Sequence, residues 1–316
     1  MNRRLASVLA MTLLGSAIVY AQDYPSKPIR IVTTAAGGGG DFTTRQLAQG
    51  ISGALGQTIV VDNRASGFLS AEAVAKSPAD GYTLLVTGSA VWISTLFRAV
   101  PYDINKDFAG ITIIEVTPSV FAVHPSVPVK NIKELIALAK SRPGALSYGS
   151  NSIGGRGHLG MEMFKAMAGV NILHVPYKGS AAANTALLSG ETQITLDDPG
   201  LLIPHAKIGK MRLLAVSTST PTALAPGLPT VTDSGLPGYE LEGITGFFAP
   251  AKTPAAIISR LNLESVRALN TPEVKQRFLN ASVEVVASAP EKLMDRVRSD
   301  LNKFGKVVKD ANIRIE

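Results

Sequence analysis

Short β-rich runs alternate with amphipathic runs along most of this chain, and this alternation restricts the fold more than any other feature. In the first helical run, Phe42, Leu47, Ile51 and Leu55 recur at a spacing that places them roughly on one side of a helix. Strand, loop, helix and strand in succession are typical of a parallel sheet covered by helices. The first set of predicted elements comprises a strand at 29–34, a loop at 37–40, a helix at 41–55, a strand at 58–62, a short helix around 71–77 and a strand at 83–87.

A second set of alternating elements begins after a break at residues 121–129. Asn131 and Glu134 have the spacing of a capping box before a run of apolar residues, which predicts a helix start. Thr253 and Pro254 predict another start, with the threonine as N-cap and the proline at the first helical position, and helices continue to about residue 309. In this half, strands are predicted at 145–149, 172–175, 193–196, 213–217 and 243–250, and helices at 158–168, 181–189 and 200–208.

Two such sets and a helical tail predict an α/β protein of two lobes, each a mostly parallel sheet with flanking helices. We assign residues 22–122 plus 247–316 to lobe 1 and residues 123–246 to lobe 2. Crossings of the chain near 122–125 and 246–250 are expected to form a hinge. Ligands of such sheets lie beyond the carboxyl ends of the strands, so we expect the site in the cleft between the lobes.

The first 21 residues have the pattern of a secretory signal peptide. Arg3 and Arg4 precede an apolar stretch at 5–20, and residues 19–21 have the small-x-small form of a cleavage site. A membrane anchor is the alternative, but the stretch is short for a span, which needs about 20 residues. We therefore predict a periplasmic protein whose net charge falls from +7 to +5 when the two arginines are removed.

The positive charge does not indicate a nucleic-acid partner. Lysine and arginine are scattered singly, without a run of five or six and without a basic stripe interleaved with aromatic residues. The sequence has no cysteine, which excludes thiol nucleophiles, thiolate zinc sites and iron–sulfur clusters.

Signatures of catalysis are also missing from the sequence. It has no Gly-x-Ser-x-Gly elbow and no His-Glu-x-x-His helix, and its four histidines lack the spacing of metal ligands. We therefore predict a monomeric binding protein without cofactor or metal, and not an enzyme. The alternative is an exported lyase or isomerase on the same scaffold, using Asp197, Asp198 or His158.

A run of four glycines, Gly37, Gly38, Gly39 and Gly40, lies between a predicted strand and a predicted helix, and Asp41 follows it. Glycine lets the backbone take positive φ and approach a ligand closely. The free N–H groups and the dipole at a helix N-terminus favour an anion. We predict anion binding here with Asp41 as the helix cap, and an ordinary turn is the alternative. The loop lacks the lysine of a P-loop. A dinucleotide fingerprint is a weak alternative, with an acidic residue about twenty positions downstream.

A second polar, glycine-rich loop lies at the equivalent place in the second half, between the strand at 145–149 and the helix at 158–168. It supplies hydroxyl, amide and glycine N–H groups, so two facing loops would hold a carboxylate from both sides. Capping and turn formation are the alternative role. Its candidate ligand-binding residues are Ser150, Asn151, Ser152, Gly154, Gly155 and His158.

Two further strand ends carry polar side chains. Ser89 follows the strand at 83–87 and is placed to face the cleft. Asp197 and Asp198 end a strand of the second half. Paired carboxylates can act as acid and base or accept a ligand hydroxyl or amine, although capping of the next helix is the favoured role.

An ordered series of short motifs, spread over the whole chain after the signal peptide, resembles the TctC-type (Bug family) solute receptors of tripartite tricarboxylate transporters. No single motif is decisive, but their order is specific. The series is Tyr24-Pro25-x-Lys27-Pro28-Ile29, the glycine loop ending at Asp41, Gly56-Gln57-x-x-Val60-Val61-Asp62-Asn63-Arg64, Asp80-Gly81-Tyr82-Thr83-Leu84-Leu85, His174-Val175-Pro176-Tyr177-Lys178-Gly179, Leu228-Pro229-Thr230 and Phe248-Ala249-Pro250.

The resemblance implies a type II periplasmic binding protein fold whose lobes close on a small carboxylate, and delivery of that solute to integral-membrane subunits. A receptor that feeds a membrane sensor is the alternative partner. Carried onto this sequence, the ligand loops are 37–41 and 150–158. Tyr177 of the shared motif and Ser66, in a loop that should border the cleft, join the candidate ligand-binding residues.

The chain departs from the family pattern in its loops. Ala36 replaces a proline, Gly40 replaces a Ser or Thr, and residues 65–70 are shorter than the family's glycine-rich stretch and carry Phe68. Together with Trp92, Phe68 favours an aromatic or larger apolar acid as ligand, and packing is the alternative role of both rings.

Overall fold

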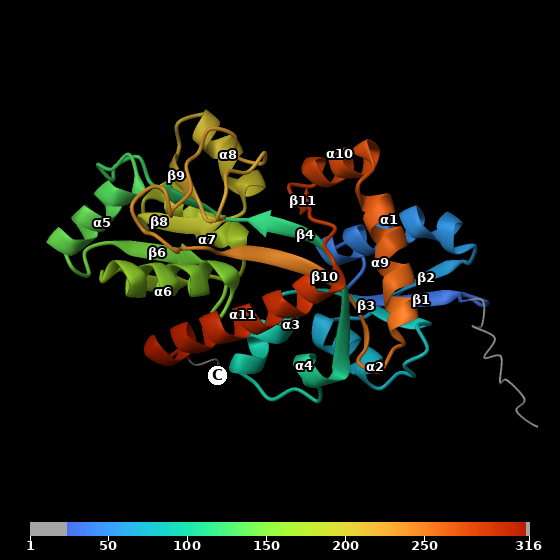
Figure 1. Cartoon of the computed structure of the whole chain (residues 1–316). Helices are drawn as coiled ribbons and strands as arrows, with labels where there is room; N and C mark the ends of the chain where they lie inside the picture. The colour runs from blue at the N-terminus through green and yellow to red at the C-terminus, as the bar shows by residue number, and fades with distance from the viewer. Residues whose placement is uncertain (1–23, 314–316) are drawn as a thin grey trace, which may run out of the picture.

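The computed structural model describes residues 24–313, which form two lobes built on separate sheets with helices on their faces (Figure 1). The signal peptide predicted at 1–21 lies outside these residues. The predicted two-lobed α/β architecture is confirmed.

The first sheet has six strands in the order β11-β4-β10-β3-β1-β2. Strand β1 pairs in parallel with β2 and β3, whereas β10 runs antiparallel to β3 and β4, and β11 runs antiparallel to β4. The strands are β1 (Ile29–Thr33), β2 (Ile59–Asn63), β3 (Thr83–Gly88), β4 (Phe108–Pro118), β10 (Glu242–Pro250) and β11 (Glu284–Val285).

The second sheet has five strands in the order β7-β6-β8-β5-β9. Strand β6 pairs in parallel with β7 and β8, and β5 runs antiparallel to β8 and β9. The predicted parallel arrangement thus holds for β2-β1-β3 and β7-β6-β8, but both sheets are mixed because strands at the crossings run against their neighbours. The strands are β5 (Val120–Val123), β6 (Ser147–Ser150), β7 (Leu173–Pro176), β8 (Ile194–Asp197) and β9 (Arg212–Val216).

The chain crosses between the sheets at two points. The first crossing is at Ser119, the only residue between β4 and β5. The second crossing, back to the first sheet, is at Leu241, which leads into β10. Both crossings lie a few residues before the predicted ones. We propose the limits of the lobes at these two points.

The helices cover the faces of both sheets (Figure 1). Asn131 caps its helix as predicted, since Oδ1 accepts the Glu134 N–H at 2.9 Å. The prediction for Thr253 was wrong: Pro254 is the N-cap and the helix begins one residue later, at Ala255. The helices are α1 (Gly39–Leu55), α2 (Gly67–Ala75), α3 (Ala90–Ile93), the 3-10 turn η1 (Ser94–Leu96), α4 (Ile104–Asp107), α5 (Ile132–Ser141), α6 (Arg156–Ala168), α7 (Ser180–Ser189), α8 (Pro199–Lys207), α9 (Ala255–Leu269), α10 (Pro272–Asn280) and α11 (Pro290–Asp310).

Helix α11 packs against both lobes. Its first half places Leu293 and Val297 in a cluster with Trp92 and other residues of the first lobe. Its second half places Phe304 and Val307 in the core of the second lobe. The tail that we assigned to lobe 1 therefore spans the junction, as Figure 1 shows.

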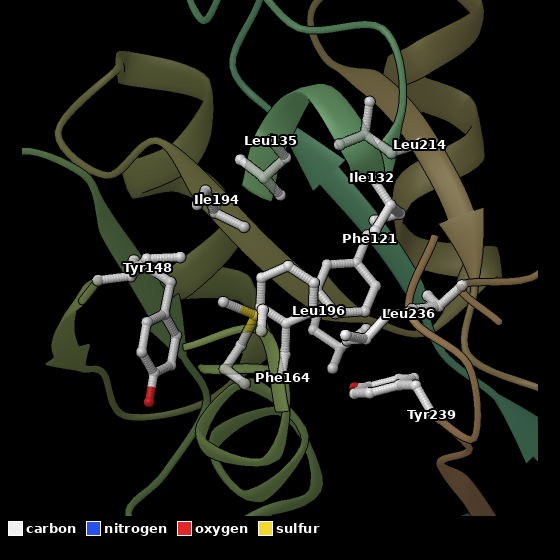
Figure 2. Packing of buried hydrophobic residues seen from close by; sticks show 14 of the residues in the cluster. Phe121, Ile132, Leu135, Tyr148, Phe164, Ile194, Leu196, Leu214, Leu236 and Tyr239 are labelled. Atoms are coloured by element: carbon white, nitrogen blue, oxygen red, sulfur yellow. The ribbon is translucent and has the colours of Figure 1, made fainter. Parts of the chain in front are cut away.

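The core of the second lobe is built around three aromatic side chains (Figure 2). The ring centroid of Phe121 lies 5.0 Å from that of Phe164 and 5.7 Å from that of Tyr239. The buried Tyr239 hydroxyl donates to the Gly160 carbonyl, so its polar atom is satisfied. This core supports α6, the helix that follows the second predicted ligand loop.

Candidate ligand-binding site

The glycine loop of the first lobe leads directly from β1 into α1. Gly37 has φ of +81°, and Gly38 is the N-cap without a side-chain cap. Gly40 is needed for space, because a Cβ there would lie 2.5 Å from the Thr34 hydroxyl oxygen. The helix begins two residues earlier than predicted, so the N–H groups of Gly39 and Gly40 belong to its first turn and have no acceptor within the helix. This turn can offer backbone N–H groups to an anion.

Asp41 holds this loop in place. The prediction that Asp41 caps the helix was wrong, because Gly38 is the N-cap. One carboxylate oxygen accepts the Gly37 N–H at 2.9 Å, and the other accepts the Asn63 amide and the Arg45 guanidinium, each at 2.9 Å. Arg45 above all, and then Gly37 and Asn63, lower the pKa of Asp41 to about 2 against the effect of burial. Asp41 is therefore a buried anion whose oxygens are all occupied, which suits it to hold the loop.

The loop of the second lobe leads from β6 into α6 in a similar way. The helix begins at Arg156, two residues before the predicted start, with Gly155 as an N-cap that has no side chain. A Cβ at Gly155 would lie 2.7 Å from the Asn151 amide oxygen and even closer to the Ser152 hydroxyl, so a larger residue would displace both side chains. The Ser150 hydroxyl contacts His174 Nε2 at 2.7 Å, so that it braces the base of the loop.

His158 lies beneath this loop and is buried. Its Nδ1 accepts the Gly154 N–H at 2.9 Å, and its ring stacks on His174 with centroids 3.9 Å apart. Burial, and then the charge of His174, lower the pKa of His158 to about 4. A neutral ring is required because Nδ1 must accept a hydrogen bond, so His158 positions the loop.

The two aspartates at the end of β8 have separate partners. Asp197 is buried and accepts the Asn184 amide at 3.2 Å and the Asp198 N–H at 2.9 Å, and burial raises its pKa. Asp198 occupies the N-cap position of α8 but makes no capping bond, because its carboxylate pairs with Arg156. The favoured capping role was therefore wrong for these side chains.

Two other candidates make contacts within their own lobe. The Ser66 hydroxyl accepts the Leu69 N–H at 3.4 Å at the start of α2. The Tyr177 hydroxyl donates to Glu191 at 2.8 Å. Ligand contact by Ser66 and Tyr177 stays a prediction.

A pocket of about 140 Å³ lies between the lobes. Of the predicted residues, Ser89, Gly154 and Gly155 line it, while the others lie outside its lining. The first lobe also contributes Phe68 and Ile93, and the second lobe contributes Arg156 and Leu159. The crossing segment adds Leu241 and Glu242, and α11 adds Phe304.

Only some of these lining residues carry a signal in the sequence. Phe68 departs from the family pattern, and Arg156 lies within the predicted second loop. Leu241 and Phe304 come from distant segments that only tertiary packing brings to the pocket. Trp92 does not reach it: the ring is fully buried, and Nε1 donates to Asp300 at 3.1 Å.

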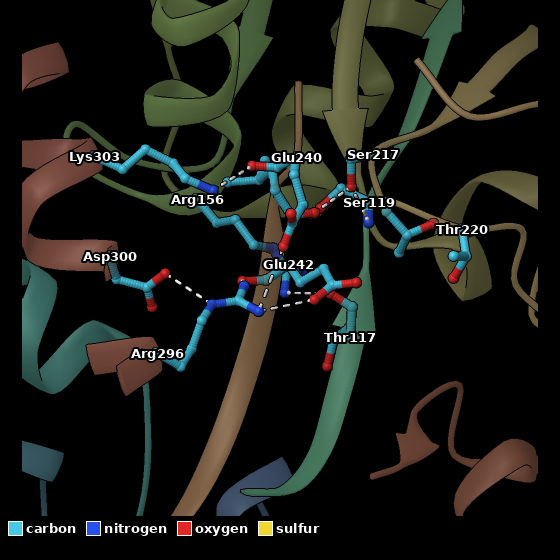
Figure 3. Close-up of polar contacts among 12 residues, drawn as sticks. Thr117, Ser119, Arg156, Ser217, Thr220, Glu240, Glu242, Arg296, Asp300 and Lys303 are labelled. Carbon is cyan, nitrogen blue, oxygen red and sulfur yellow. Dashed lines mark hydrogen bonds and ion pairs between the residues drawn. The ribbon is translucent and has the colours of Figure 1, made fainter. Parts of the chain in front are cut away.

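Polar contacts hold together the segments at which the chain crosses between the two sheets (Figure 3). The Ser217 hydroxyl accepts the Ser119 N–H at 2.9 Å and donates to the Leu241 carbonyl, so it joins three chain segments. Arg296 of α11 pairs with Glu242 at 3.0 Å and with Asp300 at 2.9 Å. These bonds fasten the start of β10 to α11 beside the pocket.

Two lobes with crossing strands, a pocket between them and a helix N-terminus from each lobe define a two-lobed solute-binding protein of the periplasmic type. The chain belongs to the tripartite tricarboxylate transporter family receptors (TctC), because the model of that family matches residues 43–313. Protein BugT of Bordetella pertussis is 30% identical over 322 residues, with 99% of each chain covered.

Solved structures of similar proteins agree with this assignment. The R. palustris protein Rpa4515 with adipate is 33% identical, with a TM-score of 0.72 and coverage of 92% of this chain and 99% of that one. MatC from Rhodopseudomonas palustris with bound malate is 27% identical, with a TM-score of 0.68 and coverage of 90% and 100%.

Two further observations concern residues 24–313. No helix in this range combines the length and the apolar composition that crossing a membrane requires. Within the same range, no group of three or more His, Asp or Glu side chains could hold a metal ion.

Proposed function

We propose that this chain is an exported, monomeric receptor that captures a small organic carboxylate between its lobes and delivers it to integral-membrane subunits of a tripartite transporter. The observation that carries the proposal is the pair of helix N-termini, α1 and α6, which begin at glycine loops at the carboxyl ends of β1 and β6 in opposite lobes. Each can present backbone N–H groups to one anion.

The similar proteins support a carboxylate as the solute. Adipate and malate, named with two of the similar structures, are both dicarboxylates. An enzymatic role has less support, because His158, Asp197 and Asp198 each have a protein partner and do not form a free acid–base pair. The chain uses no cofactor in this proposal.

A thermal-shift panel tests the proposal. The mature protein is heated with aliphatic, aromatic and hydroxy acids and with the corresponding neutral amides as controls. An acid at about 100 times its dissociation constant should add about 2.7 kcal/mol to the apparent free energy of unfolding. The amides should add little, because they carry no charge for the helix N-termini. Folded protein that responds to no carboxylate, or equally to acids and amides, would contradict the proposal.

A further inference from the structure

The pocket between the lobes is walled by apolar side chains from separate parts of the chain. Phe68 lies in the first turn of α2, Ile93 ends α3, Leu159 belongs to α6, Leu241 leads into β10 and Phe304 belongs to α11. Leu159, Leu241 and Phe304 are buried, so this wall is fixed by the cores of the lobes. The pocket therefore offers a preformed apolar surface.

The charged groups that border this pocket already have partners. Arg156 pairs with Asp198 and also approaches the Thr117 carbonyl at 3.4 Å. Glu242 pairs with Arg296 at 3.0 Å. Among the lining residues that the structure describes, no unpaired cation is left to neutralise an anion, so a carboxylate buried away from the α6 N-terminus at Gly154 and Gly155 would lose its hydration without compensation.

Exposed apolar residues adjoin two of the lining residues in the sequence, and one cation, Arg98, lies against Phe68. Leu69, next to Phe68, is 50% exposed, and Ile153, next to Gly154, is 44% exposed. The Arg98 guanidinium lies 4.7 Å from the centre of the Phe68 ring, which holds that ring in place. An apolar group that enters from the cleft would meet apolar side chains of both lobes.

The volume limits the size of such a group. The pocket encloses about 140 Å³. An apolar cavity of about 150 Å³ is large enough to hold benzene. A six-membered ring or a short alkyl chain therefore fits, and a bulkier group does not.

We propose that the solute is an amphipathic monocarboxylate, whose carboxylate binds at the glycine loops while its ring or alkyl chain of about six carbons fills this pocket. This inference rests on the proposed function, because it assumes that the loops hold a carboxylate. Phe68 would then be a specificity determinant. The pocket should discriminate against solutes that carry a second carboxylate at their far end.

Hexanoate and adipate form the matched test, because they share a six-carbon chain and differ in the second carboxylate. Calorimetric titration of the mature protein should give a dissociation constant at least about 10-fold lower for hexanoate, since adipate would bury an unpaired charge. Phe68→Ala should weaken hexanoate about 10-fold through the lost apolar contact. Leu263→Ala, an exposed site on α9, is the control and should change neither affinity.

A second variant keeps the test decisive if Phe68→Ala folds poorly. Phe68→Lys replaces a lining ring by a cation, in addition to the neighbouring Arg98, and should shift the preference toward adipate by about 10-fold or more. Tighter adipate binding in the wild type, unchanged by both Phe68 variants, would overturn the inference and leave the proposed function intact. Failure of every acid in the thermal-shift panel would instead overturn the proposed function, and the inference with it.

Discussion

Arg296→Ala should lower the free energy of unfolding by about 3–5 kcal/mol, because it leaves the buried Asp300 carboxylate and the partly buried Glu242 carboxylate without their cation. Arg296 bridges Glu242, at the start of β10, and Asp300, which is only 1% exposed. Asp300 would keep the Trp92 N–H as a partner but lose its counter-charge. Urea unfolding followed by tryptophan fluorescence measures the loss, since Trp92 is the only tryptophan.

Arg298→Ala is the matched control on the same helix. Arg298 pairs with Asp295 at 2.7 Å, but both side chains are more than half exposed. Its loss should therefore cost less than about 1 kcal/mol. Equal losses in the two variants would show that the Arg296 cluster does not stabilise the junction of β10 and α11.

Glu115→Gln should make the protein more stable relative to the wild type as the pH rises. Glu115 is buried in β4, where its carboxyl oxygens contact the hydroxyls of Thr43 and Thr245 at 2.9 Å each. Burial raises the pKa of Glu115 to about 7, although both hydroxyls oppose the shift. In the unfolded chain the carboxyl has its ordinary pKa of 4.5, so between pH 4.5 and 7 the folded state holds a proton that the unfolded state has lost.

The wild type should consequently lose about 3 kcal/mol of stability between pH 4.5 and pH 8 from this group alone, and the variant should not. Unfolding free energies of both proteins across that range give the difference, in which the other titrating groups cancel. Glu273→Gln, at a 75% exposed side chain, is the control and should follow the wild-type slope. A Glu115→Gln curve parallel to the wild type would refute a neutral Glu115 in the folded state.

The fold could be predicted because periodic apolar patterns record which residues are buried. The segments around β1, β2 and β3, and around β6, β7 and β8, are local repeats of strand and helix, and their parallel pairing follows from that order. The first crossing was not placed at its residue, because β4 continues into β5 with only Ser119 between them and no loop separates the two strands. The packing of α11 against both lobes could not be predicted for a different reason. An amphipathic pattern shows that a helix has a buried face, but it does not show which lobe covers that face.

The candidate site could be predicted only in part. Both glycine loops were found, since glycine runs between strand and helix are a local signal. The roles of Asp41 and His158 could not be predicted, because each side chain contacts its own loop in a way that depends on tertiary structure. Expecting Trp92 near the ligand was wrong, since its indole is needed in the first-lobe core.

Hydrogen exchange of the two glycine loops tests the central claim most directly. The mature protein is measured by mass spectrometry with and without a saturating concentration of the acid that gives the largest thermal shift. Amides at 37–41 and at 154–158 should exchange more slowly together, because one carboxylate engages both helix N-termini, while exchange in α9 should be unchanged. Protection confined to one loop, or absent from both at saturation, would contradict a carboxylate held between the lobes.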